Sequence, residues 1–367
     1  MIRLAPIPAG LPATVPFVGP ETLERQAGRP FAARLGANEN GFGPSPRALA
    51  AMQAAAGEVW KYGDPTNHDL TRALAAHHGV RPRNIVVGEG IDGLLGLLVR
   101  LTVAPGDVVV TSDGAYPTFN FHVAGFGGCL NKVPYRNEAE DPQALLDRVR
   151  QVGARLVYLA NPDNPMGSWH DGTVIRTMLD DLPEGTLLIL DEAYAEFAPA
   201  DALPDIDADD PRVIRMRTFS KAYGMAGARV GYAMGHPDLI AAFDRVRNHF
   251  GVNRIGQAGA LAALQDRDWL ARTVAQVATA RARIGAIAGD NGMTALPSAT
   301  NFVAVDTGRD GAFARGLVDA LAAEGVFIRM PGVAPLNRCI RISCAPDAEL
   351  DILAEALPRA VAAVSRA

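Results

Sequence analysis

The sequence predicts an α/β protein, in which helices wrap both sides of a mainly parallel sheet and a smaller α+β domain follows. Three observations support this fold class. Apolar runs typical of strands alternate with helical patterns over the first two thirds of the chain. Polar or glycine-rich segments follow several of these runs, at the position where open α/β sheets bind ligands. A long alanine-rich stretch then leads into a tail of shorter strands and helices.

Length and composition limit the possible functions. The 367 residues suggest roughly two domains of ~150 residues each. The formal net charge is −5 and no long basic block is present, so nucleic acid is not an expected partner. No apolar run reaches the ~18 residues that a membrane helix needs.

Cysteine and histidine usage gives no sign of a metal site. The three cysteines are an odd number without metal-binding spacing, which favours a reduced, cytoplasmic protein. The seven histidines form no H-E-x-x-H pattern or paired ligand set, so we expect no metal. Residues 1–17 contain several prolines and lack the apolar core of a signal peptide, so we expect an extended arm.

The first two thirds of the chain can be divided into elements in order. The Asn-, Gly- and Pro-rich residues 35–46 predict a loop, and Ser45-Pro46 is typical of a helix start. Helices are expected at 46–56, 69–78 and 140–152, and after Gly90. Strands are expected just before Gly88 and at 108–112, 156–160, 186–190, 213–216 and 229–234.

The last third predicts the smaller domain. Residues 255–287 are alanine-rich and indicate one long helix that joins the two domains. Strands are expected at 301–305 and 326–329, and the alternation at 339–343 predicts a half-buried strand. Helices are expected at 311–323 and 347–364.

A glycine-rich turn after the first strand allows two interpretations. Gly88-x-Gly90-x-x-Gly93 lies between a strand and a helix and fits the dinucleotide fingerprint, with Asp107 and Asp113 near the place of a ribose-binding acid. That interpretation predicts a nicotinamide-dependent oxidoreductase. The same turn also presents bare backbone amides at a helix start, which suit any phosphate.

The segment 217–232 has the composition of a site for a ligand with a carbonyl and a phosphate. Lys221 follows a strand and lies close in sequence to Thr218, Ser220 and Arg229. A lysine amine forms Schiff bases with carbonyl compounds, and hydroxyls and a guanidinium bind phosphate. A solvated surface lysine is the simpler alternative for Lys221 taken alone.

Other polar residues stand at the ends of predicted strands. Asn164 lies in a rigid Asn-Pro-rich loop, and Asp191 ends a buried strand, where a carboxylate is costly unless it meets a cation. Tyr194 follows within a turn of Asp191. Tyr116, at a strand exit, could lie flat on an aromatic ligand, and Tyr62 offers a phenol on a loop; packing in the core is the alternative for both.

Together these residues resemble the pyridoxal-phosphate-dependent aminotransferases of fold type I, a resemblance that covers the chain from Asn38 to Ser343. The order and spacing of five residues carry it: Asn164, Asp191, Tyr194, Lys221 and Arg229. Residues 38–40, 191–197 and 339–343 are similar to the histidinol-phosphate aminotransferase branch. The resemblance implies a seven-stranded sheet in a large cofactor-binding domain at 38–262, a small domain at 263–367, and an arm at 1–37 that packs on the small domain or a partner subunit.

The resemblance also implies residue roles. Lys221 would bind pyridoxal 5'-phosphate covalently and carry the substrate proton, and Asp191 would keep the pyridine nitrogen protonated. Asn164 and Tyr194 would contact the ring oxygen, and Tyr116 would stack on the ring. The phosphate would rest on Gly90, Ile91, Asp92, Thr218, Ser220, Arg229 and, across a homodimer with shared sites, Tyr62.

On the substrate side, Arg341 would bind the α-carboxylate, Arg329 would bind the far end of the substrate, and Asn38 would line the pocket. The expected reaction is ping-pong transamination between histidinol phosphate and 2-oxoglutarate. The chain departs from the pattern of the branch at Gly41-Phe42, Gly93 and Met166, and the first departure removes a substrate-side phenol. An aromatic aminotransferase, an amino-acid-phosphate decarboxylase of the threonine-phosphate type and a non-catalytic pyridoxal-binding regulator remain alternatives.

Overall fold

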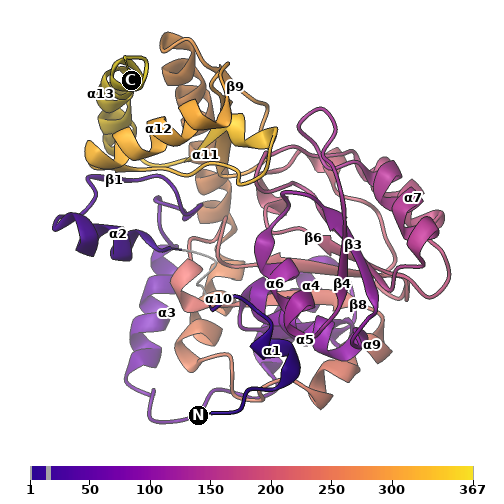
Figure 1. The fold of residues 1–367 in the computed structure, drawn as a ribbon. Helices are drawn as coiled ribbons and strands as arrows, with labels where there is room; N and C mark the ends of the chain where they lie inside the picture. Colours follow the sequence, from indigo (N-terminus) through magenta and orange to yellow (C-terminus); the bar gives the residue numbers. More distant parts are fainter. Residues whose placement is uncertain (1, 14–17, 367) are drawn as a thin grey trace.

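A computed structural model describes residues 2–13 and 18–366 of the chain (Figure 1). Its main sheet has seven strands in the order β2-β8-β7-β6-β5-β3-β4. The strands are β2 Ile85–Gly88, β3 Val108–Ser112, β4 Cys129–Val133, β5 Leu156–Ala160, β6 Leu187–Asp191, β7 Val213–Thr218 and β8 Gly231–Gly235. Strand β8 is antiparallel to β2 and β7, and the other neighbours are parallel. The expected mostly parallel sheet of seven strands is confirmed.

Helices cover both faces of this sheet. They are α3 Pro46–Ala56, α4 His68–His78, α5 Gly90–Thr102, α6 Pro117–Gly125, α7 Pro142–Val152, α8 Gly172–Asp180, α9 Pro237–Ala242 and α10 Arg254–Gln265. Successive strand side chains point to opposite faces. Tyr158 of β5 therefore packs with α5 and α6, while Val157 and Leu159 pack with α7 and α8. Burial on both faces explains the uninterrupted apolar runs of the sequence.

The last third of the chain forms the smaller lobe at the top of Figure 1. Strands β9 Thr294–Ala295, β10 Phe302–Asp306 and β12 Cys339–Ser343 form an antiparallel sheet, covered by α11 Arg267–Asp290, α12 Gly311–Ala323 and α13 Asp347–Val364. Strand β11 Val326–Phe327 pairs in parallel with β1 Ala33–Arg34. Leu35 belongs to the same apolar cluster as α12 and α13. The domain boundaries at 37/38 and 262/263 stay a prediction.

Several expected elements differ from the structure. The single helix expected at 255–287 is two helices, because Asp266 interrupts it and caps α11 through the Trp269 N–H at 3.4 Å. The arm at 1–17 is not wholly extended, since Pro6–Ala9 form the short helix α1, and a second helix α2 follows at Pro20–Ala27. Residues 1 and 14–17 of that expectation lie outside the described residues. Strand β12 is buried more fully than expected, with only Arg341 partly exposed.

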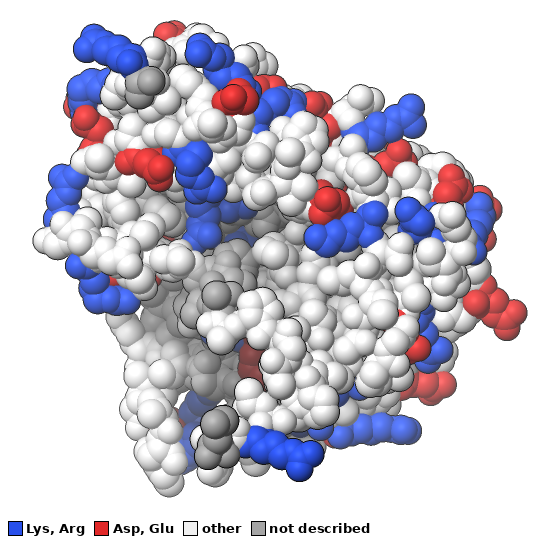
Figure 2. Space-filling view, viewed as in Figure 1, with Lys and Arg blue, Asp and Glu red and all other residues white. Residues whose placement is uncertain are grey.

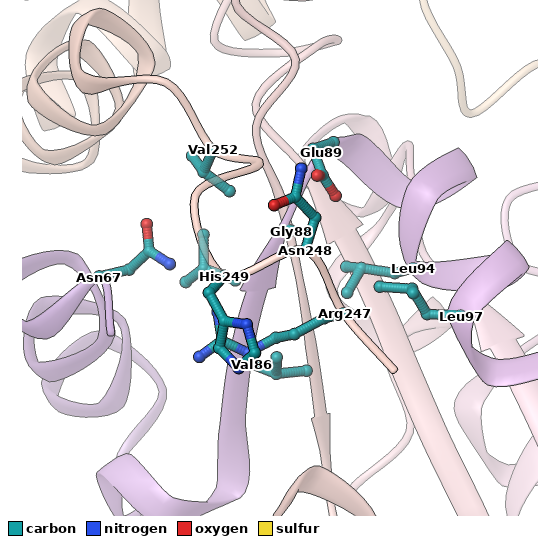
Figure 3. Close-up of a pocket in the computed structure, with 11 residues that line it drawn as sticks. Asn67, Val86, Gly88, Glu89, Leu94, Leu97, Arg247, Asn248, His249 and Val252 are labelled. Atoms are coloured by element: carbon teal, nitrogen blue, oxygen red, sulfur yellow. The ribbon is translucent and has the colours of Figure 1, made fainter. Parts of the chain in front are cut away.

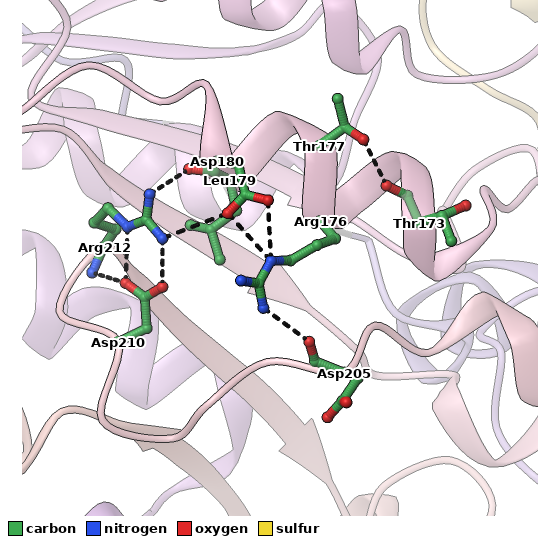
Figure 4. A network of polar contacts seen from close by, with 8 residues as sticks. All are labelled: Thr173, Arg176, Thr177, Leu179, Asp180, Asp205, Asp210 and Arg212. Carbon is green, nitrogen blue, oxygen red and sulfur yellow. Dashed lines mark hydrogen bonds and ion pairs between the residues drawn. The ribbon is translucent and has the colours of Figure 1, made fainter.

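A polar network fastens the segment that leads into β7 to α8 (Figure 4). Arg212 binds Asp210 at 2.7 Å and donates to the Leu179 carbonyl at 3.0 Å. Arg176 donates to the Asp180 carboxylate at 3.1 Å and to the Asp205 carbonyl at 3.2 Å. Arg176 and Asp180 are about half exposed and Arg212 is 36% exposed, so we expect their ion pairs to position the segment more than to stabilise the fold.

The surface in Figure 2 shows acidic and basic side chains interspersed over the visible face, without a large patch of one sign. Such a surface gives no electrostatic footprint for nucleic acid on this face. Among the described residues, no helix combines the length and apolar character needed to cross a bilayer.

Candidate active site

The carboxyl ends of three neighbouring parallel strands bring the main candidates to one edge of the sheet. Strand β5 pairs with β6 and β6 pairs with β7. Asn164 follows the end of β5, Asp191 ends β6, and Lys221 follows the end of β7. Because the ends of parallel strands meet at one edge, these residues, which are far apart in sequence, face a common region.

Asp191 is a buried carboxylate held by two hydrogen-bond donors. Its Oδ1 accepts from the Ala193 N–H at 3.0 Å and its Oδ2 from the Tyr158 hydroxyl at 2.7 Å. Burial raises the pKa of Asp191 to about 6; the two donors lower this pKa, and the carboxylates of Asp92 and Glu192 raise it. Asp191 is therefore ionised at neutral pH although burial disfavours its charge, and it suits a ligand cation such as a protonated pyridine nitrogen.

Lys221 has the environment of a nucleophilic amine. Its Nζ donates a hydrogen bond to the Asn38 carbonyl at 3.1 Å and lies 5.6 Å from the centre of the Tyr194 ring. Burial lowers the pKa of Lys221 to about 8, and the charges of Arg341 and Arg229 also lower it. A useful fraction of the amine is therefore neutral near pH 8, and the neutral form attacks carbonyl groups.

Arg229, Ser220 and the start of α5 form an anion-binding group. Gly90 begins the helix at φ 76°, and a Cβ there would lie 2.5 Å from Arg229 Nη2. Glycine thus lets the guanidinium reach the helix start. Arg229 Nη1 donates to Ser220 Oγ at 3.3 Å, and its Nη2 lies 3.7 Å from the Asp92 carboxylate. Helix amides, a hydroxyl and a guanidinium are the groups that bind phosphate in proteins.

Three further expected residues lie around this group. The Tyr116 hydroxyl donates to Asp92 Oδ1 at 2.9 Å, which ties the tyrosine to the start of α5. Thr218 Oγ1 accepts from the Ser220 N–H at 3.0 Å and so shapes the turn that presents Ser220. The Ile91 side chain is 7% exposed and packs in the core beneath α5, which leaves its backbone amide to serve a ligand.

Two arginines lie next to each other on the smaller lobe. The backbones of Arg329 and Arg341 form an antiparallel bridge with N–H···O distances of 3.2 and 2.6 Å. Arg341 Nη1 donates to Asn164 Oδ1, and Arg329 Nη2 donates to the Val18 carbonyl at 2.7 Å. Burial lowers the pKa of Arg341 to about 10, and the charge of Arg329 lowers it as well. The pair therefore favours an anion.

Asn38, expected on the substrate side, lies between two other candidates. It is 3% exposed, its carbonyl accepts from Lys221, and its side-chain amide donates to the Tyr194 hydroxyl at 3.1 Å. Tyr62 lies apart from this group. Its side chain is 77% exposed, and its ring packs 4.6 Å from that of Phe250.

A small cavity lies beside the first glycine of the fingerprint. Figure 3 shows a cavity between β2 and the segment 247–252, lined by Gly88 and Glu89. Its volume of about 10 Å³ suits one water molecule at most. Gly90, by contrast, lies against Arg229. This arrangement favours the single-phosphate interpretation over the dinucleotide one.

Sequence reasoning missed the residues that support the site. The apolar pattern at 156–160 does not single out Tyr158, although a hydroxyl inside such a strand indicates a buried partner. Asn301, 0% exposed, donates from Nδ2 to the Asn38 carbonyl at 3.1 Å. Glu192 anchors the end of β6 by ion pairs to Arg215 at 2.8 Å and Arg217 at 2.9 Å. Burial alone would raise the pKa of Glu192, but the two arginines outweigh it and lower that pKa to about 2.

The departures from the family pattern lie in packed surroundings. Met166 is 1% exposed in a small apolar cluster with Leu336 and Cys339, and Phe42 packs against the core of the smaller lobe. A Cβ at Gly93 would lie 3.3 Å from the Glu89 side chain. No group of three His, Cys, Asp or Glu among the described residues could hold a metal ion.

Comparisons with known proteins agree with this geometry. The family model of aminotransferase class I and II matches residues 33–357. The histidinol-phosphate aminotransferase 1 of Mesorhizobium japonicum is 35% identical over 97% of this chain and 95% of its own length. The histidinol-phosphate aminotransferase of Roseiflexus castenholzii is 37% identical over 96% of this chain and 97% of its own.

A solved structure is more similar still. It is the histidinol-phosphate aminotransferase from Sinorhizobium meliloti in complex with pyridoxal-5'-phosphate. Its sequence is 59% identical, the match covers 99% of both chains, and the TM-score is 0.96.

Proposed function

This chain belongs to the class I and II aminotransferases, and on that premise we propose that it transfers the amino group of histidinol phosphate to 2-oxoglutarate with pyridoxal 5'-phosphate as cofactor. The arginine pair carries the substrate assignment. Histidinol phosphate bears a phosphate monoester where an α-amino acid bears a carboxylate. A dianion at this position would offset the mutual repulsion of Arg329 and Arg341. In the free protein, burial first and the charge of Arg329 second lower the pKa of Arg341.

The residues present fit the cofactor. The ring nitrogen of the cofactor requires an ionised carboxylate, which Asp191 provides. The cofactor aldehyde requires a partly neutral amine, which Lys221 provides. Gly90, Ser220 and Arg229 would hold the phosphate. When bound, the cofactor supplies an aldehyde and an electron-withdrawing ring, which accept the amino group and the electrons of the Cα–H bond.

The protein residues then have separate tasks. Arg341 and Arg329 would bind the anionic end of the substrate. The Lys221 amine would act as the general base at the substrate Cα, because its pKa is lowered to about 8, mainly by burial. Tyr194 and Asn164 would direct hydrogen bonds toward the ring oxygen. Arg341 would bind the α-carboxylate of 2-oxoglutarate in the second half of the reaction.

Arg329→Ala tests the substrate assignment. We expect the KM for histidinol phosphate to rise roughly 10- to 100-fold, the worth of one charge-assisted hydrogen bond. The KM for phenylalanine should change far less, because its carboxylate carries one negative charge, which Arg341 can bind alone, whereas the phosphate dianion calls for both arginines. Steady-state kinetics with both donors gives the comparison. Equal losses for the two donors would place Arg329 outside the specificity site.

A homodimer with shared sites is part of the proposal. An apolar patch is exposed on α3, the loop after it and the segment before α10; its members are Leu49, Val59, Trp60, Tyr62 and Phe250, which are 43–78% exposed. Monomers rarely expose so many large apolar side chains together. Burial against a second copy would bring Tyr62 to the partner's phosphate group.

Trp60→Glu tests this interface. A charge on the patch should convert a particle of twice the chain mass into monomers and weaken cofactor binding, because each site would lose the tyrosine of the other subunit. Light scattering and cofactor titration measure the two effects. Val174→Asp, at a 41% exposed valine of α8, is the matched control and should change neither. An unchanged mass for Trp60→Glu would remove the patch from the interface.

A further inference from the structure

Asn38 adopts a backbone conformation that few residues tolerate. Its φ of 53° lies in the left-handed region, where a non-glycine residue is strained, although asparagine is among the more tolerant. The residue is also 3% exposed, in the segment between β1 and α3. Such strain persists where the surroundings hold it in place, and it often marks a functional position.

The Asn38 carbonyl holds the Lys221 amine. It accepts from Lys221 Nζ and from Asn301 Nδ2, each at 3.1 Å. The second donor, on a fully buried residue, fixes the direction of the carbonyl. A carbonyl is uncharged, so it orients the amine without stabilising the ammonium form as strongly as a carboxylate would. This partner is consistent with the lowered pKa of Lys221, which burial causes first.

The Asn38 side chain lies between Ser343 and Tyr194 and makes a hydrogen bond with each. Ser343 Oγ accepts from the Asn38 N–H at 2.9 Å and lies 3.4 Å from Asn38 Oδ1, to which it donates. The amide oxygen therefore faces Ser343, and the amide nitrogen donates to the Tyr194 oxygen at 3.1 Å. Because that oxygen accepts from Asn38, the hydroxyl proton of Tyr194 is left to point at another acceptor, and the bond it donates is strengthened.

We propose that Asn38 is a positioning residue that directs the Lys221 amine with its carbonyl and the Tyr194 hydroxyl proton with its amide. The proposed function places both groups at the cofactor, so this role rests on the proposed function. The link to Ser343 adds a mechanical connection, because Ser343 and Arg341 lie on the same strand, β12. Asn38 thus joins the substrate-binding lobe to the two residues that serve the cofactor.

Two variants separate positioning from packing. Asn38→Gly keeps the carbonyl and suits the positive φ, but it removes the amide donor. Asn38→Asp keeps the shape and, when ionised, accepts a hydrogen bond from Tyr194 in place of donating one, which turns the hydroxyl proton away from the cofactor. We expect kcat to fall about tenfold in Asn38→Gly, the worth of one hydrogen bond, and to fall further in Asn38→Asp. A packing role predicts the opposite order, because aspartate preserves the volume.

The second readout is the absorption spectrum of the bound cofactor, recorded as a function of pH. Its midpoint is the pH at which half of the spectral change has occurred. A weaker hydrogen bond from Tyr194 to the ring oxygen should raise the midpoint of this titration in both variants, and more in Asn38→Asp. Asn137→Gly is the matched control, because Asn137 also has a left-handed φ of 50° but is exposed on a loop. Its midpoint and kcat should equal those of the wild type.

The outcomes distinguish this inference from the proposed function. An unchanged midpoint in both Asn38 variants, or a milder loss in Asn38→Asp than in Asn38→Gly, would overturn the inference while wild-type transamination stands. A rise in KM alone would make Asn38 a substrate contact instead. A wild-type protein that binds no pyridoxal phosphate would overturn the proposed function itself.

Discussion

Replacing Lys221 with alanine is expected to abolish transamination and the covalent attachment of the cofactor. We propose that the Lys221 amine is both the nucleophile that binds the cofactor aldehyde and the base that moves the substrate proton, so the rate should fall by at least ~10³-fold. Because burial lowers the pKa of this amine to about 8, attachment in the wild type should speed up as pH rises toward 8. Loss of the absorption band of the attached cofactor measures the effect.

The small number of lysines allows the site of cofactor attachment to be assigned without ambiguity. The sequence contains only three lysines, Lys61, Lys132 and Lys221. Borohydride reduction followed by peptide mass analysis should place the cofactor on Lys221 alone. Lys221→Arg should be as inactive as Lys221→Ala, because a guanidinium keeps the charge but cannot attack an aldehyde. Lys132→Ala, at a surface lysine 3.1 Å from Asp113, should behave as the wild type. A label on Lys61 or Lys132 would contradict the assignment.

Part of the candidate site could be predicted from the sequence because strand order and residue type determine it. Alternating strands and helices imply a parallel sheet, and a parallel sheet gathers Asn164, Asp191 and Lys221 at one edge. Gly90 could be predicted to contact a phosphate from local pattern as well, because a helix that starts directly after a strand presents free amides that bind anions. These inferences need only local pattern and topology.

Other features depend on tertiary contacts that no local pattern encodes. The Tyr158 hydroxyl meets Asp191 only because β5 lies beside β6. Asn38 reaches Lys221, 183 positions away in the chain, through a loop whose path the sequence does not define. Asp266 looked like one more residue of a long helix, yet its side chain caps α11 and divides the helix in two.

Asp191→Asn is expected to stabilise the cofactor-free protein while it destroys activity. Burial raises the pKa of this carboxyl from 3.8 to about 6 in the folded state. Below pH 3.8 the carboxyl is protonated in both states and imposes no cost. As pH rises from 4 to 6 the unfolded chain ionises first, so the free energy of unfolding falls with pH. Above pH 6 the cost levels off at about 3 kcal/mol, which asparagine avoids because it carries no charge.

The same substitution removes the carboxylate charge that we propose as the partner of the protonated ring nitrogen. Activity should therefore fall by ~10³-fold or more, and the cofactor should bind more weakly. Thermal unfolding of the cofactor-free protein at pH 5 and pH 8 measures the stability change, and the gain should be larger at pH 8. Asp163→Asn is the matched control, because burial also raises the pKa of Asp163, to about 7. It should stabilise the protein similarly and keep the cofactor. Stabilisation by Asp191→Asn with full activity would show that the charge serves neither ring nor reaction. Loss of both stability and activity would mean that the hydrogen bonds from Tyr158 and Ala193 to the carboxylate outweigh the cost of burying its charge.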